Sequence, residues 1–125
     1  MALANAVVKR YGAIWNESDP GKRRDLIGQT FTEDATYLDP MLAGEGHAGM
    51  EAMIDGVQAQ LPGARVSLTS EPDEHHDWVR FSWKLVLPGE VDSFIEGTDV
   101  GQIGPDGRFE RIVGFLDKVP AAIAS

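Results

Sequence analysis

The feature that most constrains this chain is a change in the spacing of its apolar residues near the middle. Up to Leu61 they recur at every third or fourth position, which is typical of helices with one buried face. From Val66 they recur at every second position, and in residues 79–87 every odd position is apolar. A period of two places successive side chains on opposite faces of a strand. Helices first and strands second predict an α+β domain, with helices packed on one face of a curved antiparallel sheet.

The predicted elements follow from this spacing and from turn-forming residues. Asp19 is expected to cap the second helix, with Pro20 at its first helical position. A short extended segment and a glycine-rich loop separate the second helix from the third. The helices are predicted at about 3–15, 20–31 and 50–61, the extended segment at 35–38 and the loop at 41–49. Strands are predicted at 65–69, Val79–Leu87, Val91–Ile103 and Arg108–Leu116, joined by turns at 71–77, 87–90 and 104–107.

Length and cysteine content limit the kinds of protein this can be. The 125 residues are expected to form one domain, 1–125, which buries enough surface to fold without a metal or a disulfide. Because there is no cysteine, disulfides, thiolate zinc sites and cysteine nucleophiles are excluded. The adjacent His75 and His76 lie in a predicted surface turn and should point apart, so we expect no metal site. No cofactor is expected either.

Charge and hydropathy bear on partners and location. The formal net charge of −9, from 11 basic and 20 acidic residues, repels phosphate backbones and anionic lipid. We therefore expect neither a nucleic-acid partner nor a membrane partner. No apolar run approaches the ~20 residues needed to cross a bilayer. The first ten residues lack the features of a signal peptide, so the expected location is the cytoplasm.

Two aspartates and a tyrosine are candidates for acid–base chemistry. Asp39 closes the stretch TYLDP, where it could form a turn with nearby backbone or act as a base at the mouth of a pocket. Asp99 has only isoleucine and glycine neighbours on its strand face, so burial is expected to raise its pKa. Tyr11 shares a helical stripe with apolar residues, which places its ring in the core and requires a partner for its hydroxyl.

Aromatic and apolar residues near these groups could be plain core or the wall of a ligand pocket. If the turn after residue 87 is tight, Asp99 lies near Phe81 and Trp83, because residues 95–99 then face residues 79–83. The candidate substrate-binding residues are Trp15, Tyr37, Met53, Val57, Phe81, Trp83 and Phe115.

Several stretches together resemble the nuclear transport factor 2-like superfamily, which includes ketosteroid isomerase and the SnoaL-like polyketide cyclases. They read RYGAIWN, FTEDATYLDP, GHAGMEAMI, EGTDVGQI and PDGRFERIVGF, and the resemblance extends from Val7 to Asp117. It implies a cystatin-like fold, in which a cone-shaped curved sheet packs against three N-terminal helices.

The resemblance also implies roles for the three candidate catalytic residues. Ketosteroid isomerase has a tyrosine donor, an aspartate base before a proline and a protonated aspartate donor, which match Tyr11, Asp39 and Asp99. In SnoaL-like cyclases the late-strand aspartate does the acid–base work, and that position is Asp99. The resemblance therefore leaves open which aspartate is the base.

The leading hypothesis is a small cofactor-independent enzyme that moves protons on a hydrophobic carbonyl compound, as an isomerase or a polyketide cyclase does. The first alternative is a non-catalytic module of the same fold that binds a hydrophobic ligand or dimerises. The second is an epoxide hydrolase, which would need an Asp-Arg-Asp relay, whereas Arg80 and Arg111 are expected at the surface.

Bulky residues on both faces of the long strands predict a homodimer. Trp78 and Val86 occupy the face opposite Phe81 and Trp83. Since the helices can cover only one face, the other is expected to cover a second copy of the chain.

Overall fold

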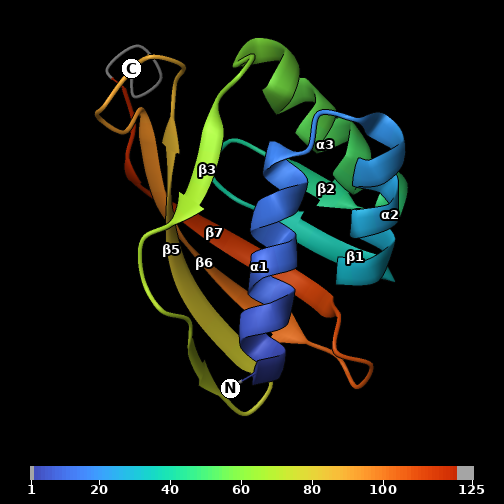
Figure 1. Ribbon diagram of the computed structural model, residues 1–125. Helices are drawn as coiled ribbons and strands as arrows, with labels where there is room; N and C mark the ends of the chain where they lie inside the picture. Colours follow the sequence, from blue (N-terminus) through green and yellow to red (C-terminus); the bar gives the residue numbers. More distant parts are fainter. Residues whose placement is uncertain (1, 121–125) are drawn as a thin grey trace.

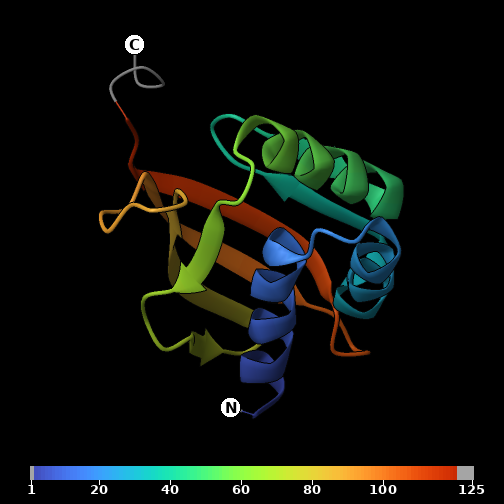
Figure 2. The ribbon, with the colours of Figure 1, turned by 45° about the horizontal axis from the view of Figure 1, so that its top comes forward.

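The computed structural model describes residues 2–120, and its three helices lie on one face of a curved, unclosed sheet (Figures 1 and 2). The expected α+β class is confirmed. The helices are α1 (Ala2–Asn16), α2 (Pro20–Thr30) and α3 (Gly46–Gln60). The strands are β1 (Phe31–Leu38), β2 (Ala43–Glu45), β3 (Arg65–Leu68), β4 (Asp73–His75), β5 (Trp78–Val86), β6 (Ile95–Ile103) and β7 (Phe109–Lys118). No helix within residues 2–120 is both long enough and apolar enough to span a bilayer.

The start of α2 is confirmed, and its end corrects a prediction. Asp19 Oδ2 accepts a 2.8 Å hydrogen bond from the backbone N–H of Lys22, with Pro20 at the start of the helix. Phe31 was expected on the helix but is the first residue of β1, because its extended backbone ends α2. Its N–H still bonds to the carbonyl of Ile27, so helix and strand follow each other without a loop.

The sheet is mixed, which corrects the expectation of a purely antiparallel sheet. Its strand order is β2-β1-β7-β6-β5-β3, with β4 paired to β5. All pairs are antiparallel except β1 with β7, which run parallel. The antiparallel pairs β5–β6 and β6–β7 fix the direction of β7. The remaining edge of β7 pairs with β1, which comes from the N-terminal half of the chain. This pairing places β1 residues beside β7 residues on the helix-covered face.

Two short strands were missing from the sequence prediction. Residues 43–45 were expected to belong to a loop, and residues 73–75 to a polar turn. Three residues are too few to show an alternation of apolar and polar positions. Each of these strands forms only by pairing with a longer strand, β2 with β1 and β4 with β5. The same correction moves the start of α3 back to Gly46, whose φ of 70° favours glycine.

The register between β5 and β6 differs from the expectation by two residues. Phe81 faces Asp99 and Trp83 faces Gly97, so residues 95–99 lie opposite 81–85. The difference arises because β6 begins at Ile95, after a longer connection than a tight turn. A shift of two residues keeps each side chain on its face, so Asp99 still lies near the two predicted aromatic residues.

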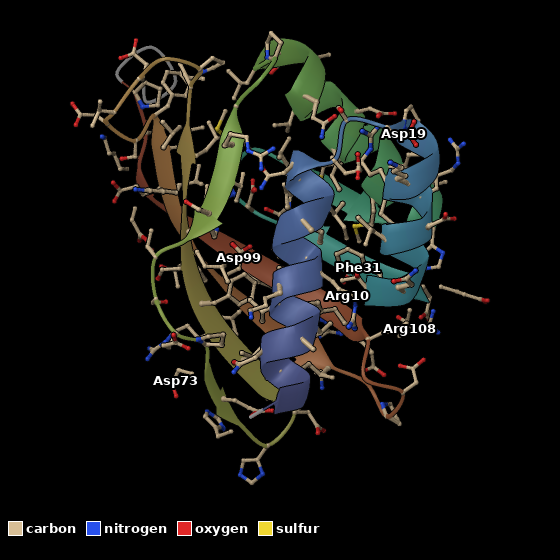
Figure 3. All side chains as sticks on the ribbon, in the orientation of Figure 1. Arg10, Asp19, Phe31, Asp73, Asp99 and Arg108 are labelled. Carbon is tan, nitrogen blue, oxygen red and sulfur yellow. The ribbon has the colours of Figure 1, made fainter. Side chains whose placement is uncertain are left out.

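An aromatic cluster joins α1 to the sheet. The ring of Tyr11 makes edge contacts with Phe31, Phe81 and Phe109, at centroid distances of 6.0, 5.5 and 5.9 Å. At the edge of the core, Arg108 Nη1 donates to the carbonyls of Gly28 and Phe31, tying the turn before β7 to the start of β1 (Figure 3). The core therefore fixes Tyr11 over the centre of the sheet.

Candidate active site

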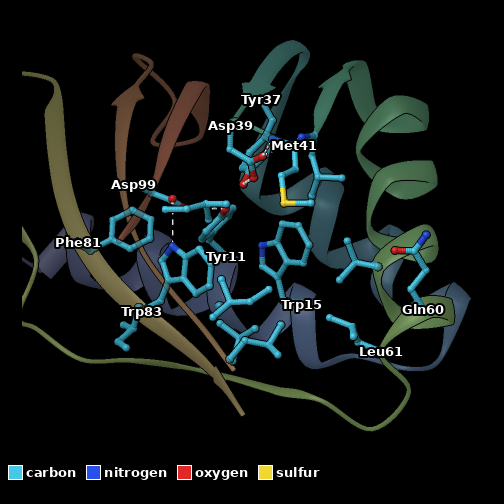
Figure 4. Close-up of a pocket in the computed structure, with 18 residues that line it drawn as sticks. Tyr11, Trp15, Tyr37, Asp39, Met41, Gln60, Leu61, Phe81, Trp83 and Asp99 are labelled. Carbon is cyan, nitrogen blue, oxygen red and sulfur yellow. Dashed lines mark hydrogen bonds between the residues drawn. The ribbon is translucent and has the colours of Figure 1, made fainter. Parts of the chain in front are cut away.

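A cavity of about 130 Å³ lies between α1, α3 and the helix-covered face of the sheet (Figure 4). The predicted residues that line it are Tyr11, Trp15, Tyr37, Asp39, Val57, Phe81, Trp83 and Asp99. Other lining residues, which sequence reasoning did not single out, include Met41, Leu42, Gln60, Leu61, Val66, Leu68, Leu85, Ile95 and Leu116. The period of two could have identified the strand members of this set, because they share a face with residues already selected.

Asp99 is the buried polar group of this cavity. It is only 1% exposed, and it accepts hydrogen bonds from Tyr11 Oη to Oδ2 (2.8 Å) and from Trp83 Nε1 to Oδ1 (3.0 Å). Burial raises the pKa of Asp99 from 3.8 to about 6. The hydrogen bonds from Trp83 and Tyr11 lower this pKa, and the nearby charge of Asp39 raises it. The result is a carboxyl that can take up or release a proton near neutral pH.

Asp39 both forms a turn and lines the cavity. Its Oδ1 accepts hydrogen bonds from the backbone N–H groups of Met41 (2.8 Å) and Leu42 (2.7 Å), as in an Asx-turn. Its Oδ2 accepts a 2.6 Å hydrogen bond from Tyr37 Oη. Asp39 therefore fixes the chain after β1 and holds the Tyr37 hydroxyl in the cavity wall.

The two tyrosine hydroxyls are donors that stay protonated. Burial, followed by the charge of Asp99, raises the pKa of both Tyr11 and Tyr37 well above the ordinary value of 10.0. Each donates to a different aspartate, Tyr11 to Asp99 and Tyr37 to Asp39. The cavity thus holds two acceptor carboxyls, each next to a hydroxyl donor.

Gly114 lies where the two aspartates approach each other. It pairs with Asp99 across β6 and β7. A Cβ at this position would lie 2.7 Å from Asp99 Oδ1, 3.3 Å from Asp39 Cβ and 3.5 Å from Tyr37 Oη. Only glycine leaves room for these three groups. The period of two places Gly114 on the same face as Ile112, but nothing local in the sequence reveals what stands above it.

Gly97 makes the corresponding space for Trp83. A Cβ at Gly97 would lie 2.7 Å from Cε2 of the indole, so the ring rests directly on bare backbone. This position directs Nε1 toward Asp99. Gly97, seen in the sequence only as an uncovered strand position, therefore allows an aromatic donor to reach the carboxyl.

Some candidate residues do not join this site. Phe115 is 57% exposed on the opposite face of the sheet, and Met53 is buried in the core without lining the cavity. Arg80 and Arg111 are exposed, as expected, and Arg80 pairs with Asp73 at 2.8 Å. The lining, taken over the residues that the structure describes, contains no lysine, arginine or histidine.

Replacing Trp83 tests how the charge of Asp99 is stabilised. Trp83→Phe removes the N–H that donates to Oδ1, and that hydrogen bond is the largest influence lowering this pKa. We expect the pKa of Asp99 to rise above its value of about 6, as followed by carboxyl ¹³C NMR titration. Trp78→Phe, on the opposite face, is the matched control and should leave the titration unchanged. An unchanged or lower pKa of Asp99 in Trp83→Phe would show that the Trp83 N–H does not stabilise the Asp99 carboxylate.

Comparison with known proteins yields structural relatives. The sequence matches no protein-family model and no curated protein. A proposed isomerase of the SnoaL-like family from Agrobacterium tumefaciens is 41% identical, with 94% of this chain and 100% of that chain covered and a TM-score of 0.89. A nuclear transport factor 2-like protein of unknown function from Exiguobacterium is 18% identical, with coverage of 90% and 99% and a TM-score of 0.72. A proposed SnoaL-like polyketide cyclase from Jannaschia is 15% identical, with coverage of 89% and 85% and a TM-score of 0.67. The last two show similarity of fold alone.

Proposed function

The chain belongs to the SnoaL-like family, and on that premise we propose that it is a small enzyme that transfers protons on a hydrophobic carbonyl compound. The reaction is of the isomerase or cyclase type, in keeping with the names given to the Agrobacterium and Jannaschia proteins. It needs no cofactor, because removing a proton next to a carbonyl requires only a base and donors for the enolate oxygen.

The observation that carries this proposal is the environment of Asp99. A buried carboxyl that accepts two hydrogen bonds inside an apolar cavity is unusual in a structural role. General acid–base catalysis is most effective when the pKa of the catalytic group lies near the working pH, and that of Asp99 is raised to about 6.

Each residue then has a defined part in the reaction. The Asp99 carboxylate takes a proton from the carbon next to the carbonyl. Because each tyrosine hydroxyl carries one proton, Tyr11 and Tyr37 turn from Asp99 and Asp39 to donate hydrogen bonds to the enolate oxygen that forms. In an isomerisation Asp99 returns the proton to another carbon of the enolate. In a cyclisation the enolate carbon instead bonds to a second carbonyl carbon, whose C=O π bond opens to an alkoxide that takes the proton back from Asp99. Asp39 holds Tyr37, so the division of roles follows the cyclase resemblance rather than the isomerase one.

The alternatives differ in what the cavity should contain. An epoxide hydrolase relay would need an arginine between two aspartates, and no arginine is among the described lining residues. A non-catalytic binding module would not need two carboxyls in one cavity. Asp39 and Asp99 both line the same space, close to Gly114, and this favours the enzyme.

The function is tested by hydrogen exchange on ketones. Wild-type protein in D₂O should speed deuterium incorporation next to the carbonyl of a hydrophobic ketone, as measured by NMR. Because Asp99 acts as a base when ionised, the rate should rise with pH through about 6 and level off above it. Binding of the ketone without any catalysed exchange would favour the non-catalytic module.

The chain is also proposed to form a homodimer through the uncovered face of the sheet. No helix within residues 2–120 packs on this face. Val113 pairs there with both Leu38 and Val100, and Leu38 and Phe115 are more than half exposed. Such an apolar row typically marks an interface.

Light scattering should therefore give twice the monomer mass of 13.6 kDa at tens of micromolar protein. Phe115→Asp places a charge in the row and should yield monomers that still bind ligand. A wild-type monomer under these conditions would rule out the sheet-face dimer.

A further inference from the structure

We infer that the substrate is an uncharged carbonyl compound about the size of a single ring, and that Trp15 sets this limit. The inference deepens the proposed function and rests on it for the carbonyl. It does not rest on it for size or charge, which follow from the volume and lining of the cavity.

The size limit follows from the volume of the cavity. At about 130 Å³ it is close to the ~150 Å³ of an engineered protein cavity that holds one benzene. Pockets for drug-sized ligands occupy about 300–1,000 Å³. A fused polycyclic ketone would have to leave most of its rings in water. A single-ring ketone can bury most of its apolar surface.

Trp15 limits the cavity because its position is fixed on several sides. Its ring contacts Tyr11 and Tyr37, at centroid distances of 6.3 and 6.1 Å, and its backbone carbonyl accepts a 3.1 Å hydrogen bond from Gln58 Nε2. In Figure 4 the indole lies between the end of the cavity that holds Asp99 and the end formed by Leu61. A smaller side chain at Trp15 would widen the cavity between these two ends.

The charge limit follows from the polar groups of the lining. They are two carboxyls and neutral donors such as Tyr37, with no cationic side chain among the described lining residues. An anionic ligand would meet Asp99 and Asp39 without a compensating charge, which disfavours its binding. A cationic ligand would pair with Asp99 and lower its pKa, making it a weaker base. A neutral ligand avoids both effects.

The test is a binding series followed by tryptophan fluorescence, since Trp15 and Trp83 line the cavity. The probes are 2-cyclohexenone, a bicyclic enone, a tetracyclic steroid enone and the anionic 3-oxocyclohexanecarboxylate. We expect the single-ring ketone to bind at least about tenfold more tightly than the steroid, and the anion not to bind. The inference would be overturned if the steroid, or the anion, bound as tightly as 2-cyclohexenone. These measurements need no turnover, so the absence of exchange would count against the proposed function alone.

A substitution at Trp15 then tests the cause of the limit. In the wild-type protein the single-ring ketone should bind more tightly than the bicyclic enone. Trp15→Leu should reverse this order. Trp78→Leu, on the opposite face, is the matched control and should keep the wild-type order. If Trp15→Leu does not fold, Trp15→Phe should narrow the difference between the two ketones in the same direction. An unchanged order of affinities in the folded Trp15 variant would overturn the role of this residue.

Discussion

Asp99→Asn should lower the rate of catalysed proton exchange by about 10²–10⁴-fold, because a positioned base contributes that much and asparagine cannot take up the proton. Binding of the ketone should persist, since the amide has nearly the same shape and can still accept from Tyr11 or Trp83. The measurement is deuterium incorporation at saturating ketone, with the affinity obtained separately by fluorescence.

Asp39→Asn is the matched comparison. The asparagine amide oxygen can still accept the two backbone hydrogen bonds that form the turn, so only the bond from Tyr37 Oη is lost, because the amide NH₂ cannot accept it. We expect a fall in rate of less than about tenfold. A larger loss in Asp39→Asn than in Asp99→Asn would instead make Asp39 the base, as the isomerase resemblance implies.

The stability of Asp99→Asn shows whether a loss of rate reflects chemistry or unfolding. Because the pKa of Asp99 is raised in the folded state, its protonated form favours folding below pH 3.8, and this stabilisation is lost as the pH rises through about 6. A rise from 3.8 to about 6 corresponds to about 3 kcal/mol of unfolding free energy. At pH 7 the uncharged variant should therefore be at least as stable as wild type in urea unfolding.

Phe109→Ala should lower the unfolding free energy by about 3–5 kcal/mol, the typical cost of emptying a phenylalanine site in a close-packed core. Phe109 has no exposed surface, and its ring lies within 6.4 Å of the rings of Tyr11, Phe31 and Phe81. Its ring also lies directly on Gly101, where a Cβ would be 2.5 Å away. Because Gly101 has no side chain, it cannot fill the cavity that the substitution would leave. Urea unfolding at pH 7 measures the change.

The control for Phe109→Ala is a truncation outside the core. Val91 is 91% exposed, and Val91→Ala should change the unfolding free energy by no more than about 0.5 kcal/mol. A loss of less than about 1 kcal/mol in Phe109→Ala would mean that this cluster does not anchor α1 to the sheet.

The fold class and the placement of Asp99 could be predicted from the sequence because both depend on local patterns. The change in the spacing of apolar residues, from a helical period to a period of two, can be read from residues close together in the chain. The helix cap at Asp19 is also a local feature. The twofold period also fixes which face of β6 carries Asp99. An error of two residues in register left it on the correct face, next to Phe81 and Trp83.

The division of roles within the site could not be predicted, because it depends on contacts between distant segments. The parallel pairing of β1 with β7 brings Asp39 close to Gly114, and no local pattern specifies that pairing. The stretch TYLDP is compatible with both a turn and a pocket residue, and Asp39 serves as both, since its two oxygens have different partners. The sequence by itself determined the helices, the longer strands and the faces of those strands, which follow from backbone geometry. Only the tertiary structure decided which side chains meet, since contacts across a sheet depend on strand order and register.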